Sequence, residues 1–170
     1  MSQTLTNLNY ATNTRGVLEI HRAPEVSFTA TNFQIPGIST VSPLQPTPFT
    51  DFPIHGDKLT YSPLTMSFIV TEDLKNWRLL ILWMYSFTNP IDFENWDDSN
   101  EKYSDATIFM YNSHNNLEIE ILFKELIITS IDGLTFDTTS ESTDELICTV
   151  TFDYQNYDIV GMKRRELNNG

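Results

Sequence analysis

Residues 64–84 read LTMSFIVTEDLKNWRLLILWM, and they contain the one segment of the chain with a clear helical pattern. The first part, LTMSFIV, has strand character and is followed by Thr71, a residue type that often caps helices. Acidic residues at 72 and 73 then place negative charge where a helix begins. Asn89-Pro90 ends the pattern. The apolar residues that recur at helical spacing between these limits are Leu74, Trp77, Leu80, Ile81 and Met84.

The apolar arc of this predicted helix is wide, because Leu79, Leu82 and Trp83 extend it. A wide arc predicts that the helix is covered on most sides, by the chain's own core and by a neighbouring subunit. A buried strand over residues 79–85 is the competing interpretation, and the length of the pattern and the cap favour the helix. The candidate core or interface residues on this helix are Trp77, Leu80 and Met84.

Most of the remaining sequence alternates between apolar and polar residues, as half-buried strands do. VSFTATNF at 26–33 places Val26, Phe28 and Ala30 on one face, which predicts a strand. Two alternating segments flank residues 114–116, which predicts a hairpin. ELICTVTFDY at 145–154 predicts a closing strand. The fold class is therefore mostly β: about seven or eight strands in an antiparallel sandwich or barrel with one flanking α-helix.

Residues 38–63 hold five of the chain's eight prolines. Because proline cannot donate a hydrogen bond to a neighbouring strand, this segment is not a regular central strand throughout. It suits two short strands joined by a long projecting loop at residues 45–56. Apolar side chains on such a loop usually meet a partner. The candidate contact residues on the loop are Pro46, Phe49, Phe52 and Pro53.

Length and composition indicate one globular domain of 170 residues. We expect a flexible N-terminal arm at 1–15, a β domain at 16–160 and a C-terminal tail at 161–170. The net charge of −13 argues against a nucleic-acid-binding surface and against attraction to an anionic membrane. The longest apolar run, at 79–85, is far shorter than the ~20 residues of a membrane span. We expect no membrane association.

Residues that carry catalysis or bind metals are sparse. The three histidines lie far apart in sequence, and Cys148 alternates within a predicted strand as a small core residue. Asp97 and Asp98 lie in an acidic segment that is better interpreted as a solvated loop than as a calcium site. We therefore predict no enzyme, no catalytic residue, no metal and no cofactor.

Three segments, taken in order, carry a family resemblance. They are GVLEIHRAPEVSFTATNFQIPGI (16–38), FPIHGDKLTYSPLTMSFIVTEDLKNWRLLILWM (52–84) and LFKELIITSIDGLTFDTTSESTDELICTVTFDYQNYDIV (122–160). The first resembles the opening hairpin of the tail tube proteins of contractile-tailed bacteriophages, relatives of type VI secretion inner-tube proteins. The second resembles that family's projecting loop, next strand and helix, and the third its terminal strands.

The resemblance implies a structural virion protein. It implies a tail tube subunit that forms stacked hexameric rings, with the projecting loop reaching the adjacent ring and the bore guiding DNA during ejection. The implied partners are copies of the chain itself and the tail sheath and baseplate proteins. DNA would pass without specific binding, because an acidic bore repels it. The implied location is the virion tail, assembled in the host cytoplasm.

Three alternatives remain open at this point. The chain is also compatible with a tube-fold protein at the end of the tube, as a baseplate initiator or as a tube terminator. From a different class, a monomeric β-sandwich binding module, with Trp and Tyr on its loops holding a sugar or peptide, also fits the strand pattern.

Overall fold

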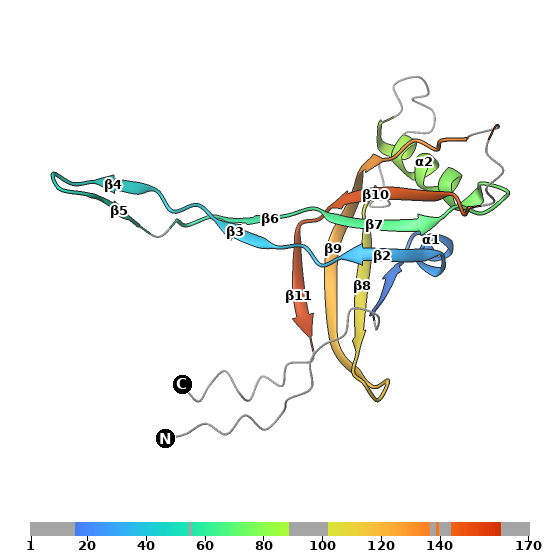
Figure 1. Ribbon diagram of the computed structural model, residues 1–170, viewed down its shortest axis with the longest axis horizontal. Helices are drawn as coiled ribbons and strands as arrows, with labels where there is room; N and C mark the ends of the chain where they lie inside the picture. Colours follow the sequence, from blue (N-terminus) through green and yellow to red (C-terminus); the bar gives the residue numbers. More distant parts are fainter. Residues whose placement is uncertain (1–15, 55, 89–101, 137–138, 140–143, 161–170) are drawn as a thin grey trace.

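The computed structural model describes residues 16–54, 56–88, 102–136, 139 and 144–160 (Figure 1). The predicted N-terminal arm at 1–15 and the predicted tail at 161–170 lie outside these residues. The elements in chain order are β1 (Gly16–Ile20), α1 (Pro24–Phe28), β2 (Ala30–Gln34), β3 (Ile38–Thr40), β4 (Leu44–Pro46), β5 (Asp51–Pro53), β6 (Leu59–Tyr61), β7 (Leu64–Ile69), α2 (Lys75–Thr88), β8 (Ser104–Tyr111), β9 (Leu117–Ile131), β10 (Ile147–Asp153) and β11 (Asn156–Val160).

Seven strands form one antiparallel sheet in the order β1-β8-β9-β10-β7-β2, with β11 paired to β9. The long strand β9 lies in the middle of this order and joins its two parts. Its residues 117–126 pair with β8, and its residues 127–131 pair with β10. Between the two parts Glu125 has a φ of 54°, a local irregularity that redirects the strand. The sheet therefore divides into two halves, β1, β8 and β11 in one and β10, β7 and β2 in the other.

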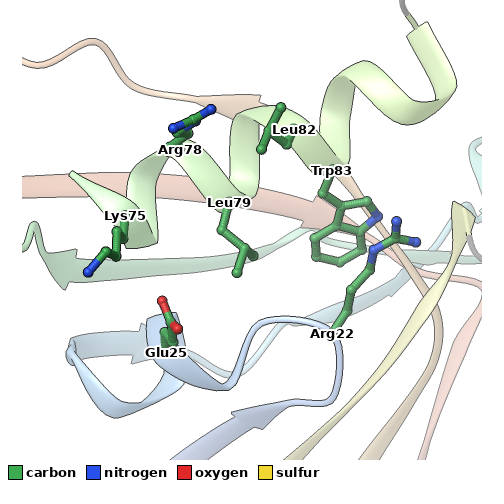
Figure 2. Close-up of a pocket in the computed structure, with 7 residues that line it drawn as sticks. All are labelled: Arg22, Glu25, Lys75, Arg78, Leu79, Leu82 and Trp83. Carbon is green, nitrogen blue, oxygen red and sulfur yellow. The ribbon is translucent and has the colours of Figure 1, made fainter. Parts of the chain in front are cut away.

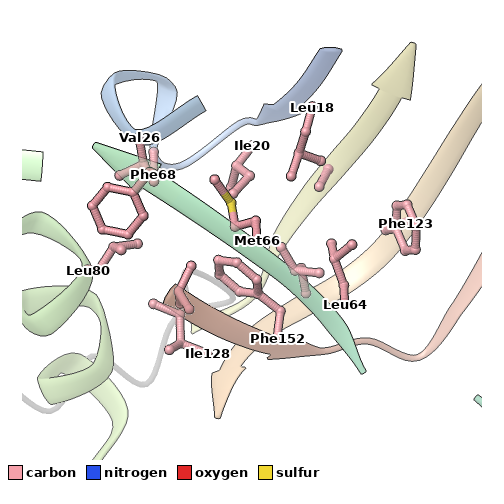
Figure 3. Packing of buried hydrophobic residues seen from close by; sticks show 14 of the residues in the cluster. Leu18, Ile20, Val26, Leu64, Met66, Phe68, Leu80, Phe123, Ile128 and Phe152 are labelled. Carbon is pink, nitrogen blue, oxygen red and sulfur yellow. The ribbon is translucent and has the colours of Figure 1, made fainter. Parts of the chain in front are cut away.

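The two halves enclose one hydrophobic core (Figure 3). In β7 every second residue is buried, namely Leu64, Met66 and Phe68, as the two-residue period of a strand requires. The helix α2 covers this core with Leu80, which is completely buried, and with Trp83, whose ring centroid lies 6.0 Å from that of Phe152. The predicted mostly β, antiparallel fold with one main helix is confirmed.

The predicted strand over residues 26–33 is wrong in its first part, and a strand, β2, begins only at Ala30. Residues 24–28 form the single helical turn α1, with proline at its first position and Glu25 in the same turn. Proline at that position has a φ already suited to a helix and no N–H to leave unpaired, and the acidic residue favours a helix start. As a result Val26 is buried while Phe28 is 92% exposed, so these two side chains do not share a face.

The expected opening hairpin is also wrong. β1 pairs with β8, whereas β2 pairs with β7, so the two strands lie at opposite ends of the sheet order. The turn of α1 redirects the chain between them. Sequence separation is the physical reason for the error, because both true partners lie more than 30 residues away and alternation alone does not identify a partner.

Helix α2 begins later than the sequence indicates. Its first residue is Lys75, and Leu74 before it has a φ of 53°. Asp73 rather than Thr71 receives a hydrogen bond from the first helical N–H, that of Lys75, at 3.2 Å. Hydrogen bonds from the Lys75 ammonium, the Thr71 hydroxyl and the Lys75 N–H lower the pKa of Asp73 to about 2.

Neither helix of the described residues has the length and the apolar character that a membrane span requires.

Candidate functional site

Residues 38–61, here called the projecting hairpin, extend away from the body of the molecule (Figure 1). Near the body β3 pairs with β6, and farther out β4 pairs with β5. Where a loop was expected at 45–56, the structure thus has two further short strands. The large apolar side chains along the hairpin are exposed: Ile38, Val41, Leu44, Phe49, Phe52, Ile54 and Leu59. A two-stranded hairpin without a packed face is marginally stable in water, so this segment is suited to a partner.

The far end of the hairpin brings the four predicted contact residues together. Pro46 is the last residue of β4, and Phe52 and Pro53 lie on β5, opposite Gln45 and Leu44. The tip, residues 47–50, is closed by the Thr47 hydroxyl, which donates to the carbonyl of Thr50 and accepts from its N–H. This closure leaves Phe49 99% exposed. The tip therefore presents one aromatic ring to the surroundings.

An aromatic cluster fixes the base of the hairpin on the body. The ring centroid of Tyr61, at the end of β6, lies 5.9 Å from that of Tyr154 and 5.7 Å from that of Tyr157. The Tyr154 hydroxyl donates to the Ser62 carbonyl at 2.8 Å. Burial raises the pKa of Tyr154 to about 12, with the neighbouring tyrosines adding to the effect. Because these contacts join β6 to the end of β10 and to β11, they set the direction in which the hairpin projects.

The two strands of the hairpin approach each other closely at Gly56. A Cβ atom built on Gly56 would lie 1.6 Å from the carbonyl oxygen of Val41, a backbone atom that cannot rotate away. Any side chain at this position therefore forces the two strands apart. No comparable restriction exists at Gly133, where the same Cβ would have nothing within 4 Å.

The three candidate residues on α2, Trp77, Leu80 and Met84, differ in burial. Leu80 is completely buried. Trp77 and Met84 are half-buried and pack against the core from its border. The indole Nε1 of Trp77 is buried and has no hydrogen-bond partner among the described residues. The face of α2 that is left for other contacts carries Leu82, which is 54% exposed.

That face borders an open groove between α1 and α2, which the sequence analysis missed. We call it the α1–α2 groove (Figure 2); its volume is about 490 Å³. It is lined by Arg22, Glu25, Lys75, Arg78, Leu79, Leu82 and Trp83. Sequence reasoning could not find it, because one wall is the turn that was expected to be a strand. The Pro24-Glu25 pair was the available signal for that turn.

The groove concentrates cations in a chain that is strongly acidic overall, although the Glu25 carboxylate also lines it. Six lysines and arginines lie within the described residues, and three of them, Arg22, Lys75 and Arg78, line it. Lys75 is paired with Asp73. The guanidinium of Arg22 lies 5.4 Å from the ring centroid of Trp83, a cation–π contact. No residue of the described part of the chain forms an ion pair with Arg22 or Arg78.

The described residues offer no metal centre: no group of three or more histidines, cysteines and carboxylates lies close enough together to hold an ion. Asp97 and Asp98 lie outside the described ranges. Cys148 is 1% exposed within β10, and burial raises the pKa of its thiol. The projecting hairpin and the α1–α2 groove are two of the surfaces that the described residues offer for binding.

Solved structures of contractile injection systems contain chains with this fold. One is a chain of the PVC sheath/tube terminator of an extracellular contractile injection system in the extended state, with a TM-score of 0.64, 16% identity, and coverage of 90% of this chain and 99% of the other. Another is a chain of the PVC sheath–tube complex in the extended state, with a TM-score of 0.59, 16% identity, and coverage of 94% and 99%. The fold is thus a tube-like fold of contractile injection systems.

The sequence itself has a relative among phage tail proteins. The chain is 29% identical over 171 residues to the tail tube terminator protein of Enterobacteria phage T4, covering 94% of each. No protein-family model matches the chain. The resemblance to tail tube proteins of contractile-tailed phages, which three segments of the sequence predict, is confirmed by this relative and by the shared fold.

Proposed function

We propose that the chain is a tail tube terminator: a non-enzymatic protein that closes the end of the tube in the virion tail of a contractile-tailed phage. The observation that carries the proposal is the relative from phage T4, which is a tail tube terminator and which matches this chain along almost its whole length. The similar chain from a sheath/tube terminator structure supports the same role. Of the roles considered from the sequence, the terminator fits these two proteins better than the tube subunit does.

In this role the chain acts through shape and contacts. Copies assemble in the host cytoplasm as a ring, for which we retain the sixfold symmetry implied by the tail tube resemblance. The ring binds the last layer of the tube and the adjoining sheath. Its acidic character, a net charge of −13 per copy, keeps DNA moving through the bore by repulsion instead of holding it. The projecting hairpin, with Pro46, Phe49, Phe52 and Pro53 at its far end, is suited to contact a neighbouring copy or layer.

A second candidate is a subunit of the tube itself, because a chain from a sheath–tube complex shares the fold with nearly the same TM-score as the chain from the terminator structure. The difference between the two roles is one of position and number. A terminator occupies one end of the tail, whereas a tube subunit occupies its whole length.

Immunogold microscopy of intact tails separates these roles. A small epitope is fused to the C-terminus of the chain, and the tagged phage is labelled with gold-conjugated antibody. We expect one cluster of gold at a single end of each tail. Gold along the whole of a contracted tail would contradict the terminator role and favour the tube-subunit role. Gold at the baseplate end would favour the initiator role. If the phage particles contain the tagged chain but their tails carry no gold, both the terminator role and the tube-subunit role are contradicted.

A test with the purified chain is independent of the phage. Under conditions that drive tube growth, a terminator forms discrete species of one size in negative stain and light scattering. Filaments of increasing length would contradict the proposal, because a terminator must not continue the stack. A stable single subunit of 19.6 kDa at high concentration would instead support the monomeric binding module.

A further inference from the structure

We propose that the α1–α2 groove of one copy receives the tip of the projecting hairpin of another copy, so that copies of this chain associate head to tail. Phe49 enters the groove, and Asp51 pairs with its arginines. This proposal rests on the proposed function in one respect, because it assumes that the chain works as an assembly of copies. It assigns the acceptor of the hairpin, which neither the sequence nor the similar proteins identify.

The two surfaces lie at opposite ends of the subunit. In Figure 1 the projecting hairpin extends from one side of the body, and α1 and α2 lie on the other side. The tip therefore cannot fold back into the groove of its own copy. A contact between two different surfaces of identical subunits is heterologous, and it produces a closed ring where the rotation between copies allows closure. This is the type of contact that a ring-forming protein needs.

The apolar parts of the two surfaces match in kind. The tip presents Phe49, which is 99% exposed, and the groove presents the half-buried Leu79 and the half-exposed Leu82, with Trp83 buried at its border. The groove is open to solvent, and its volume of about 490 Å³ leaves room for an aromatic side chain to lie against these leucines. An aromatic anchor in an apolar pocket is the usual centre of a protein interface. Burial of Phe49 also removes its apolar ring from water, which favours binding.

The charges of the two surfaces are complementary. Copies with a net charge of −13 repel one another, so a stable contact has to form where cations are concentrated. Arg22 and Arg78 in the groove have no ion-pair partner among the described residues of their own copy. Asp51 follows Phe49 by two residues and is exposed at the start of β5. When Phe49 occupies the groove, the Asp51 carboxylate two residues away is available to pair with one of these guanidinium groups, which favours binding and fixes orientation.

A mixing experiment tests this head-to-tail contact in the purified full-length chain. One variant, F49S/D51K, has a defective tip and an intact groove. The other, L82S/R78E, has a defective groove and an intact tip. Each variant alone is expected to self-associate about tenfold or more weakly than the unchanged chain, as loss of an interface anchor does. An equimolar mixture retains one functional junction per pair, so we expect a 1:1 species of twice the 19.6 kDa subunit mass in light scattering.

The mixture distinguishes this contact from any other kind of self-association. If each variant assembles as well as the unchanged chain, or if the mixture gives no species that the single variants lack, the proposal is overturned. Far-UV circular dichroism and thermal unfolding of each variant establish that it is folded. If the groove variant self-associates normally but its phage tails lose a neighbouring protein, the occupant of the groove is an acidic segment of that protein, and the proposal is again overturned.

Cross-linking tests the same contact without disturbing its charges. The pair T50C and L82C, introduced on separate copies and mixed under a mild oxidant, is expected to give a disulfide-linked dimer. The pair T50C and I159C is the matched control, because Ile159 is similarly exposed but lies on β11. The native Cys148 is buried and does not compete. Equal cross-linking of both pairs, or none of the first, contradicts the assignment. Gold at the tail end together with failed cross-linking would leave the terminator role standing and reject only the acceptor.

Discussion

Two leucines on α2, separated by one residue, provide a matched test of which face of the helix belongs to the fold and which to a partner. Leu80 is 0% exposed, whereas Leu82 is 54% exposed and lines the α1–α2 groove. The substitutions Leu80→Ala and Leu82→Ala remove the same atoms from the same helix. They also change helix propensity equally, so the difference between them reports burial alone.

The structure gives different magnitudes for the two substitutions. At Leu80, three buried carbons at about 0.8 kcal/mol each amount to about 2.4 kcal/mol of lost transfer free energy. The cavity left in the core raises the total to about 3–4 kcal/mol, within the range seen for such substitutions. At Leu82 roughly half of the side chain is already solvated and no closed cavity forms, so the expected loss is about 1 kcal/mol or less.

Urea unfolding followed by tryptophan fluorescence measures both free energies in the purified chain, and thermal unfolding with the same probe gives the thermal midpoints. Leu80→Ala is expected to lower the thermal midpoint by about 6–16 °C, taking about 2–4 °C per kcal/mol for a chain of this size. Leu82→Ala is expected to leave the midpoint within about 4 °C while weakening self-association. Equal destabilisation by both substitutions would refute the reasoning, because it would mean that the groove face of α2 is packed within its own subunit.

Three further substitutions address the elements that position the two surfaces. Asn76→Ala removes a buried amide that donates to Thr29 Oγ1 at 3.1 Å and to the Ile69 carbonyl at 2.8 Å, so we expect a loss of about 2 kcal/mol in urea unfolding; an unchanged midpoint would contradict this. Gly56→Ala is expected to open the projecting hairpin, seen as faster amide exchange there, with unchanged exchange after Gly133→Ala as the control. Because the folded-state pKa of Tyr154 is raised from 10.0 to about 12, its contribution is complete below pH 10 and is lost between pH 10 and 12. Tyr154→Phe is expected to flatten the alkaline fall in stability over that range.

Strong local patterns in the sequence predicted the corresponding elements correctly. The period-two alternation of β7 and β10 gives the two central strands of the core, and the helical spacing from Leu74 to Met84 gives α2. The proline content of residues 38–63 identified a projecting segment, because proline excludes regular pairing in the middle of a sheet. These predictions succeeded since each depends on neighbours within a few residues.

The errors and omissions concern contacts between distant residues. The turn α1 was missed because VSFTATNF alternates equally well as a strand, and the decision depends on Val26 being buried in the core. The partners of β1 and β2 were missed because pairing across more than 30 residues leaves no local trace. The α1–α2 groove was missed for both reasons, since it requires α1 and the distant helix α2 to lie side by side.

The similar solved structures indicate which part of such a chain decides whether it continues a tube or ends it. Chains from a sheath–tube complex and from a sheath/tube terminator both share the fold, so the fold alone does not decide between continuing a tube and ending it. A tube subunit needs two axial surfaces that bind copies of the same chain, whereas a terminator needs only one surface for the tube. The decision therefore lies in side chains on surfaces that the core does not constrain. Because the proposed contact between the projecting hairpin and the α1–α2 groove joins copies within one ring, the side chains that decide between the two roles are expected on the axial faces of that ring.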